Sequence, residues 1–212
     1  MKTRFILCFL LFPILTFAQK GISLGRGILE IDFRKFPTLE FHSDTLRPAG
    51  KKIRITKNKQ GDFSIQDEKQ NRTWFNPEGL WLDYSIFILR VDEKIGNWYR
   101  VYVDNKKGTT LWIKAGKTGN FMSWPEFLQT TTSVTKNKEF NLEIKSGPSD
   151  TSKTIRNLEQ SDCFEVLEIK GDWLKVQPNE TFDCDESEHP IKSGWIKWNI
   201  KNRLSVDYGL SC

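Results

Sequence analysis

The side chains best suited to contact a ligand are tryptophans, of which the chain has eight. Two of them follow turn-forming glycines, in Gly96-Asn-Trp-Tyr-Arg-Val101 and Gly171-Asp-Trp-Leu-Lys-Val176. Side chains on a strand point alternately to its two faces, and the purely apolar residues of the second segment share one face. The pattern therefore predicts that Trp173 lies with Lys175 on the opposite, polar face.

The same alternation predicts further aromatic and basic side chains on polar faces. A rigid ring provides contact area at a small entropy cost, and a neighbouring cation can pair with a carboxylate. The candidate ligand-binding residues are Trp173, Lys175, Trp195, Trp98, Arg100 and Tyr102. The alternative is that these rings pack beneath a loop or against the other domain. For Trp74, Trp81 and Trp124 we expect core or interdomain packing.

Residues that could carry out catalysis are few and scattered. His42 and His189 are the only histidines, and neither neighbours a cysteine in a way typical of a nucleophile and its base. Residues 183–189 form one dense acidic segment, but its spacing differs from that of a calcium-binding loop. Two carboxylates placed for glycoside hydrolysis stay an open alternative without a supporting motif. We predict no catalytic residue, no metal site and no cofactor.

The first 18 residues are typical of a secretory signal peptide. Lys2 and Arg4 precede an apolar run from Phe5 to Phe17, and small residues lead to a cleavage site after Ala18. The run of about 13 residues is shorter than the roughly 20 needed to span a bilayer. We therefore expect an exported, periplasmic or extracellular protein without a transmembrane segment in the mature chain.

Export permits disulfides, and Cys163, Cys184 and Cys212 follow the signal peptide. Three different single pairings are possible. Cys163 begins the strand before the turn at Gly171, and Cys184 lies a few residues beyond the strand after it. Because the hairpin would bring these ends together, we predict a Cys163–Cys184 disulfide and leave the state of Cys212 open.

The charge of the chain argues against a nucleic-acid partner. Loss of Lys2 and Arg4 with the signal peptide reduces the formal net charge from +5 to +3. Nucleic-acid binding typically requires a clustered basic face, and a nearly neutral chain gives no indication of one.

Short alternations of apolar and polar residues, separated by turn residues, predict strands along most of the chain. The expected strands are 28–33, 38–42, 51–56, 62–66, 80–91, 98–104 and 109–115, of which 38–42 is a candidate edge strand. Residues 121–128, with Pro125 among them, predict a short helical turn. Residues 129–138 are rich in Thr and without apolar periodicity, so we interpret them as a linker. The fold class is all-β, of barrel or sandwich type.

An internal repeat indicates two related domains. Gly96-Asn-Trp-Tyr-Arg-Val101 matches Gly171-Asp-Trp-Leu-Lys-Val176 at an offset of 75 residues. Thr110-Leu-Trp-Ile-Lys114 matches Ser193-Gly-Trp-Ile-Lys197 at an offset of 83, so the second copy has an insertion of 8 residues in the acidic loop. We expect a first domain over 19–128, a linker over 129–138 and a second domain over 139–212.

The second copy resembles a bacterial SH3-like (SH3b) domain, a small barrel of about five strands. The resemblance covers roughly residues 139–208 and depends on a strand that ends at Gly147-Pro148, the hairpin around Gly171 and the segment that contains Gly194-Trp-Ile. The first copy departs from the family pattern, since its front half is longer and Leu111 stands where the family tends to have Gly. The resemblance implies two SH3-like barrels in tandem.

The resemblance also implies a function. It places Trp173, and more loosely Trp98, in a peptide groove, and so predicts a secreted, non-catalytic module that binds a peptide-bearing ligand, most readily peptidoglycan or an envelope protein. One alternative is an envelope hydrolase of unrecognised type that uses scattered carboxylates. Another is a structural adaptor subunit. Exposed Trp173 and Trp98 would favour binding, a cleft with two facing carboxylates would favour an enzyme, and rings buried between two barrels would favour an adaptor.

Overall fold

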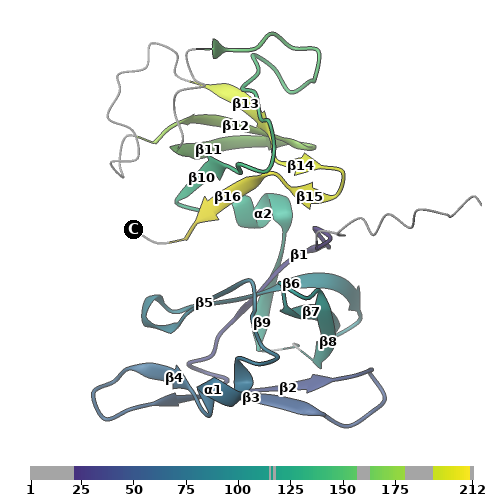
Figure 1. Cartoon of the computed structure of the whole chain (residues 1–212), viewed down its shortest axis with the longest axis vertical. Coiled ribbons are helices and arrows are strands. Elements are labelled where there is room, and N and C mark those ends of the chain that lie inside the picture. Colours follow the sequence, from purple (N-terminus) through teal and green to yellow (C-terminus); the bar gives the residue numbers. More distant parts are fainter. Residues whose placement is uncertain (1–21, 115, 117, 157–162, 180–192, 211–212) are drawn as a thin grey trace, which may run out of the picture.

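The computed structural model describes residues 22–114, 116, 118–156, 163–179 and 193–210. Within these residues, antiparallel strands form two main sheets, accompanied by short helices (Figure 1). This confirms the all-β class. The predicted signal peptide, Cys184, Cys212 and the acidic segment 183–189 lie outside the described residues, and what was predicted for them stays a prediction.

The first sheet occupies the lower half of Figure 1 and curls into part of a barrel. Its strands are β1 (Gly27–Ile31), β2 (Thr38–His42), β3 (Lys51–Lys57), β4 (Phe63–Ile65), β5 (Gly79–Trp81), β6 (Ile86–Ile95), β7 (Trp98–Asp104), β8 (Thr109–Lys114) and β9 (Gly119–Ser123). Their order is β4-β3-β2-β8-β7-β6-β1-β9, and β5 pairs with β6. Between strands lie α1 (Glu68–Asn71) and the 3-10 helix η1 (Leu82–Tyr84).

The outer strands of this sheet follow the simple alternation expected of a sheet with one buried face. In β3, Ile53 and Ile55 are buried while their neighbours are exposed. They join a core that includes Phe41, Phe75 and Phe87. Burying such side chains stabilises the fold by about 1.5–3 kcal/mol each relative to exposure, so the period of 2 fixes which face of β3 is inward.

The central strands β1 and β6 are different, because both of their faces are buried. Leu29 and Leu89 point into the first core, whereas Ile28 and Ile88 belong to a second core that lies on the other side of the sheet. A strand covered on both faces reads as a nearly continuous apolar run. This explains why residues 86–91 show no clean alternation.

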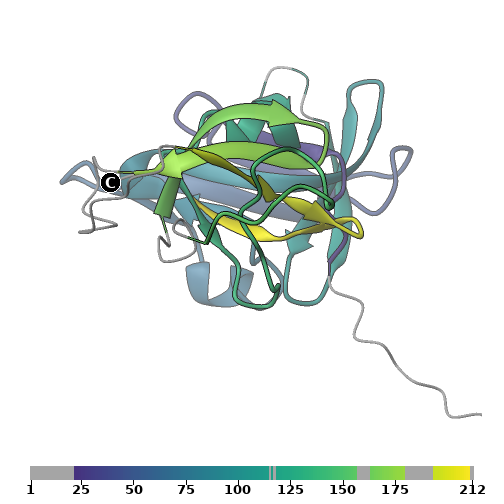
Figure 2. The same cartoon turned by 90° about the horizontal axis from the view of Figure 1, so that it is seen from above.

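The second sheet occupies the upper half of Figure 1, and from above it lies over the strands of the first (Figure 2). Its strands are β10 (Ser133–Lys136), β11 (Cys163–Lys170), β12 (Trp173–Pro178), β13 (Gly194–Lys197) and β16 (Val206–Gly209), in the order β13-β12-β11-β10-β16. A small hairpin of β14 (Asn199–Ile200) and β15 (Arg203–Leu204) stands beside them.

Helix α2 (Trp124–Leu128) lies between the two sheets (Figure 1). Ser123 caps its first turn in a capping box with Glu126, an arrangement that satisfies otherwise unpaired backbone N–H groups. Trp124 is buried in the second core, and its Nε1–H donates to the carbonyl of Leu24 at 2.7 Å. The second core therefore contains side chains from both halves of the chain, and Trp124 has the packing role, core or interdomain, that was predicted for it.

The internal repeat corresponds to a repeated five-strand order. The order β8-β7-β6-β1-β9 in the first sheet has the same succession along the chain as β13-β12-β11-β10-β16 in the second. Both central hairpins turn at a glycine with positive φ, Gly96 at 54° and Gly171 at 57°. Both also have a β-bulge at matching positions, between Val91 and Glu93 and between Val166 and Glu168. We call the two copies the first and the second unit.

Several expectations about strands differ from the structure. Strand β2 is not at an edge, because it pairs with β3 on one side and with β8 on the other. Residues 80–91 do not form one strand, since η1 and Ser85, whose φ is +63°, interrupt them. The expected strand before Gly147 contributes only isolated bridges at Lys145. The segment 129–138, interpreted as a linker, contains β10, which is held between β11 and β16.

Candidate binding site

A groove beside Trp98 is the part of the molecule that best matches the predicted aromatic and basic site. It has a volume of about 560 Å³ and lies over β2, β7 and β8. The side chains that matter most in it are those of Glu40, His42, Arg47, Trp98 and Lys114. We call it the Trp98 groove. All of its described lining comes from the first unit.

Trp98 owes its position to the turn before it. It is the first residue of β7, opposite Ile95 in β6 and Lys114 in β8. Its neighbour Tyr99 packs against the first core, so alternation directs Trp98 to the opposite face, where it is partly buried. The partly buried Trp98 ring thus lies at the groove, on the face away from Tyr99.

The side chains of Lys114 and His42 lie next to the Trp98 ring. The Nζ atom of Lys114 lies 5.8 Å from the centre of the Trp98 ring, a cation–π distance worth about 0.5–1 kcal/mol at an exposed site. The imidazole of His42 meets Trp98 edge-on, with ring centres 4.9 Å apart. Its Nδ1–H donates to the carbonyl of Arg47 at 2.8 Å, which fixes the orientation of the ring and leaves the proton off Nε2.

Among the charged side chains of the Trp98 groove, Glu40 and Arg47 have ion-pair partners, and Lys114 has none among the described residues. Glu40 forms an ion pair with Lys52 at 2.8 Å, and the hydrogen bond from this lysine holds the pKa of Glu40 below its usual value. Arg47 pairs with Asp44 at 3.0 Å. In contrast, no carboxylate among the described residues forms an ion pair with Lys114. The groove thus combines an aromatic surface with a cation that can accept a carboxylate partner.

The other residues predicted on this face of β7 have internal partners. Arg100 forms ion pairs with Asp92 at 2.7 Å and Glu93 at 2.9 Å. Tyr102 is buried, and its O–H donates to Asp92 at 3.2 Å. Burial and the charge of Asp92 raise the pKa of Tyr102. The expectation that Tyr102 is exposed is wrong, because its hydroxyl completes a polar cluster within the sheet.

The equivalent tryptophan of the second unit is covered. Trp173 is only 8% exposed, so the expectation of an open polar face is wrong for it. Its ring lies 5.4 Å from Nζ of Lys197, and this lysine pairs with Asp150 at 2.7 Å. Leu174 is fully buried on the core side as expected, but the loop that contains Asp150 meets the opposite face of β12 and β13.

Trp195 and Lys175, the remaining candidates, are cross-strand partners and both are partly buried. The backbone of Trp195 also exchanges two hydrogen bonds of 2.8 Å with Lys145. In the first unit, the matching residue Trp112 pairs with His42 of β2. The segment between β1 and β6 in the first unit and the loop around Lys145 in the second therefore contact matching strands, β8 and β13. The Trp98 groove lies beside the first of these contacts.

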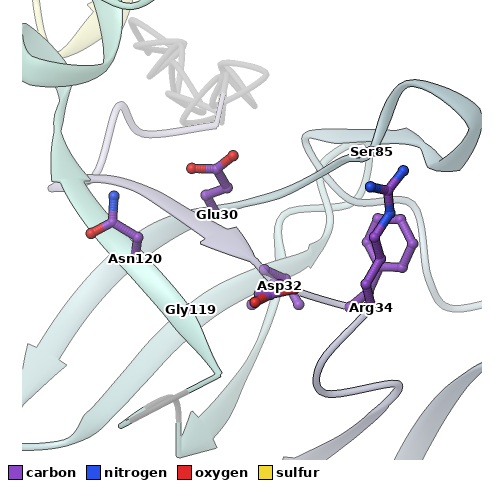
Figure 3. Close-up of a pocket in the computed structure, with 8 residues that line it drawn as sticks. Glu30, Asp32, Arg34, Ser85, Gly119 and Asn120 are labelled. Carbon is purple, nitrogen blue, oxygen red and sulfur yellow. The ribbon is translucent and has the colours of Figure 1, made fainter.

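A second pocket of about 500 Å³ lies at the end of β1 (Figure 3). Glu30 and Asn120, which are cross-strand partners, stand on its floor, with Arg34 at the opposite side. Glu30 and Asp32 are the carboxylates in the described lining of this pocket. Both are exposed and come from the same strand end, whereas glycoside hydrolysis needs carboxyl groups that flank the scissile bond. The arrangement gives the hydrolase alternative no specific support.

Comparisons with protein families, with curated proteins and with solved structures find no match to this chain. Among the described residues, no helix is long and apolar enough to cross a membrane. The same part of the chain has no group of three or more side chains suited to hold a metal ion. The inference of a function therefore depends on the geometry of the site.

Sequence reasoning missed one feature of the Trp98 groove and one elsewhere in the first unit. His42 and Lys114 belong to the Trp98 groove because β2 pairs with β8, and the sequence has no local signal for a contact between strands so far apart along the chain. Trp81, expected to pack inside, is 50% exposed. A signal for this was present in Gly79, two residues earlier, whose missing side chain leaves room for the ring: a Cβ there would lie 2.6 Å from Cζ3 of Trp81.

Proposed function

We propose that the chain is an exported, non-catalytic binding protein of two SH3-like units, and that the first unit holds a carboxylate-bearing peptide in the Trp98 groove. The repeated five-strand order supports the SH3-like assignment, because each copy places a tryptophan directly after its glycine turn. The ligand that we favour is the stem peptide of peptidoglycan. A peptide segment of an envelope protein is the alternative.

The observation that carries the proposal is the lysine above the ring. Lys114 lies over Trp98 without an ion-pair partner among the described residues, while the matching Lys197 lies over Trp173 and binds Asp150. The second unit thus contains a carboxylate at the lysine that the first unit leaves open. A ligand carboxylate in the Trp98 groove would make the same contact, with the ring beneath it.

Co-sedimentation with purified peptidoglycan sacculi tests the proposal. The protein from residue 19 onward is compared with Trp98→Ala, Lys114→Gln and the control Tyr84→Ala, an exposed aromatic residue outside the groove. We expect the parent and Tyr84→Ala to pellet with the sacculi. Truncation of a ring at the centre of a site typically costs about 2 kcal/mol or more, so Trp98→Ala should bind roughly 30-fold more weakly.

Circular dichroism of each variant separates lost binding from lost folding. A folded parent that stays in the supernatant would refute the peptidoglycan assignment. Soluble peptides then test the carboxylate contact directly: amidation of the peptide carboxylate should weaken binding to the parent but not to Lys114→Gln. An exposed ion pair contributes about 0.2–1 kcal/mol, so the expected effect of amidation is a factor of roughly 1.5–5. Equal losses in both proteins would refute the role of Lys114.

The adaptor alternative makes a different use of the tryptophans. It requires the rings to lie between the units, as Trp124 does. The described lining of the Trp98 groove comes from residues 38–118, so this ring belongs to the first unit and not to the contact between the units. This observation favours a binding site over an interface at Trp98.

A further inference from the structure

A larger and more polar pocket lies where the two units meet. It has a volume of about 770 Å³ and is lined by Glu78, Trp81 and Arg90 of the first unit and by Asn137, Asp207 and Tyr208 of the second. We call it the inter-unit pocket. Because both units supply its walls, it exists only when they are packed together.

Glu78 is the centre of a hydrogen-bonded cluster in the lining of the inter-unit pocket. Its carboxylate accepts two hydrogen bonds of 2.9 Å from the guanidinium of Arg90 and one of 2.7 Å from the O–H of Tyr208. It also accepts from the side-chain amide of Asn105. The Glu78 and Arg90 side chains are only 8% and 13% exposed. A polar cluster with this many mutual hydrogen bonds is held in one geometry.

The described lining residues carry no excess charge. Arg90, Lys106 and Arg203 are its cations, and Glu78, Glu139 and Asp207 are its anions. Several of these groups already have partners: Arg203 pairs with Glu139 at 2.6 Å, and Asp207 accepts from Asn137 at 2.9 Å. The pocket therefore offers hydrogen-bond donors and acceptors side by side but no net field for an ion. Hydroxyl groups, which donate and accept, suit such a lining.

Trp81 adds an apolar surface to these polar groups. Its ring is 50% exposed, although a tryptophan in a purely structural role gains from burial. The absence of a side chain at Gly79 gives the ring room in this position, because a Cβ at residue 79 would come within 2.6 Å of it. An exposed ring next to a few fixed polar groups is a common composition of small-molecule sites.

We propose that the inter-unit pocket binds a neutral saccharide. A sugar ring has an apolar face of C–H groups, which would stack on Trp81, and a rim of hydroxyls, which would exchange hydrogen bonds with the side chains around Glu78 and Asp207. This inference does not depend on a peptide ligand in the Trp98 groove, since the two sites share no lining residue.

Isothermal titration calorimetry with chitotetraose and with cellotetraose, at millimolar concentrations, tests the proposal. Neither probe contains a peptide. We expect saturable binding of at least one of them to the protein from residue 19 onward. Trp81→Ala should weaken it at least about fivefold, given the contribution of aromatic contacts beyond buried area, while Trp81→Tyr should retain most of the affinity.

Two further variants make the result specific. Gly79→Ala keeps the indole but crowds both it and the buried Ile88. If circular dichroism shows that this variant folds like the parent, it should weaken binding about as much as Trp81→Ala. Trp98→Ala should leave the affinity unchanged, so that a failure of the peptide proposal and a failure of this one are distinguishable. Absence of saturable binding by both probes overturns the saccharide proposal, and so does equal affinity of the parent and a folded Trp81→Ala. The proposal would also be overturned if the parent binds charged peptides instead of sugars at this pocket and Trp81→Ala abolishes that binding.

Discussion

Removal of one hydroxyl group tests whether Glu78 couples the two units energetically. In Tyr208→Phe the ring stays and only the hydrogen bond of 2.7 Å to Glu78 is lost. A hydrogen bond to a charged group contributes about 1.5–3 kcal/mol to stability. Because Glu78 retains its bonds from Arg90 and Asn105, we expect the lower half of this range, about 1.5–2 kcal/mol.

Glu78→Gln is the second perturbation. It leaves the guanidinium of Arg90, only 13% exposed, beside a neutral amide. Loss of one charge from a buried pair typically costs about 3–5 kcal/mol. The variants Tyr208→Phe and Glu78→Gln remove overlapping interactions, so the double variant should lose less stability than the sum of the two single variants, by about 0.5 kcal/mol or more.

The assay is equilibrium unfolding in urea, a denaturant that does not screen charge. It is followed by tryptophan fluorescence and circular dichroism, because coincident transitions indicate that the two units unfold together. Tyr84→Phe, at a residue that is 63% exposed, is the matched control and should change stability by less than about 0.5 kcal/mol. If Tyr208→Phe is no more destabilising than this control, or if the cycle is additive, Glu78 does not couple the units.

Further predictions concern single residues. Burial raises the pKa of Tyr208 above its ordinary value of 10.0, so the native state keeps a proton that the unfolded chain loses; the free energy of unfolding should fall as the pH rises above 10.0, and fall less in Tyr208→Phe. Trp173→Ala should cost about 3–5 kcal/mol in urea unfolding, and a change below about 1 kcal/mol would contradict its burial. Gly171→Ala should cost about 1–2 kcal/mol in the same assay, because its φ is +57°, and a neutral effect would contradict that turn. Mass spectrometry of a non-reduced digest should recover a peptide pair joined by Cys163 and Cys184, and recovery of both as free thiols would refute the disulfide.

Local patterns in the sequence were sufficient to locate most strands. The alternation in β3 and the glycine turn before β7 predicted both strands within a residue or two. The repeat was visible for the same reason, since Gly96 and Gly171 must both adopt positive φ, which few other residues do readily. These features depend on residues that are close together in the sequence, and the periodicity of the sequence depends on the same residues.

Features that depend on distant segments were not predictable in this way. Strand β10 lacks apolar periodicity because it is short, and only Val134 among its residues is fully buried. Trp173, expected on the polar face, is only 8% exposed, and Lys197 beside its ring pairs with Asp150, far away along the chain. Alternation identifies the two faces of a strand, but it does not say whether the polar face meets solvent or another part of the chain.

The two units give a reason to assign binding to the first. Both have a lysine over a tryptophan at matching positions, so this pair belongs to the shared unit and not to one site. In the second unit the lysine is neutralised by Asp150, and the ring is closed off. In the first unit the inserted strand β2 replaces that loop and contributes His42 and Glu40 to a groove instead. If a carboxylate is the natural partner of this lysine–tryptophan pair, Asp150 already provides one in the second unit. The first unit must then obtain it from a ligand.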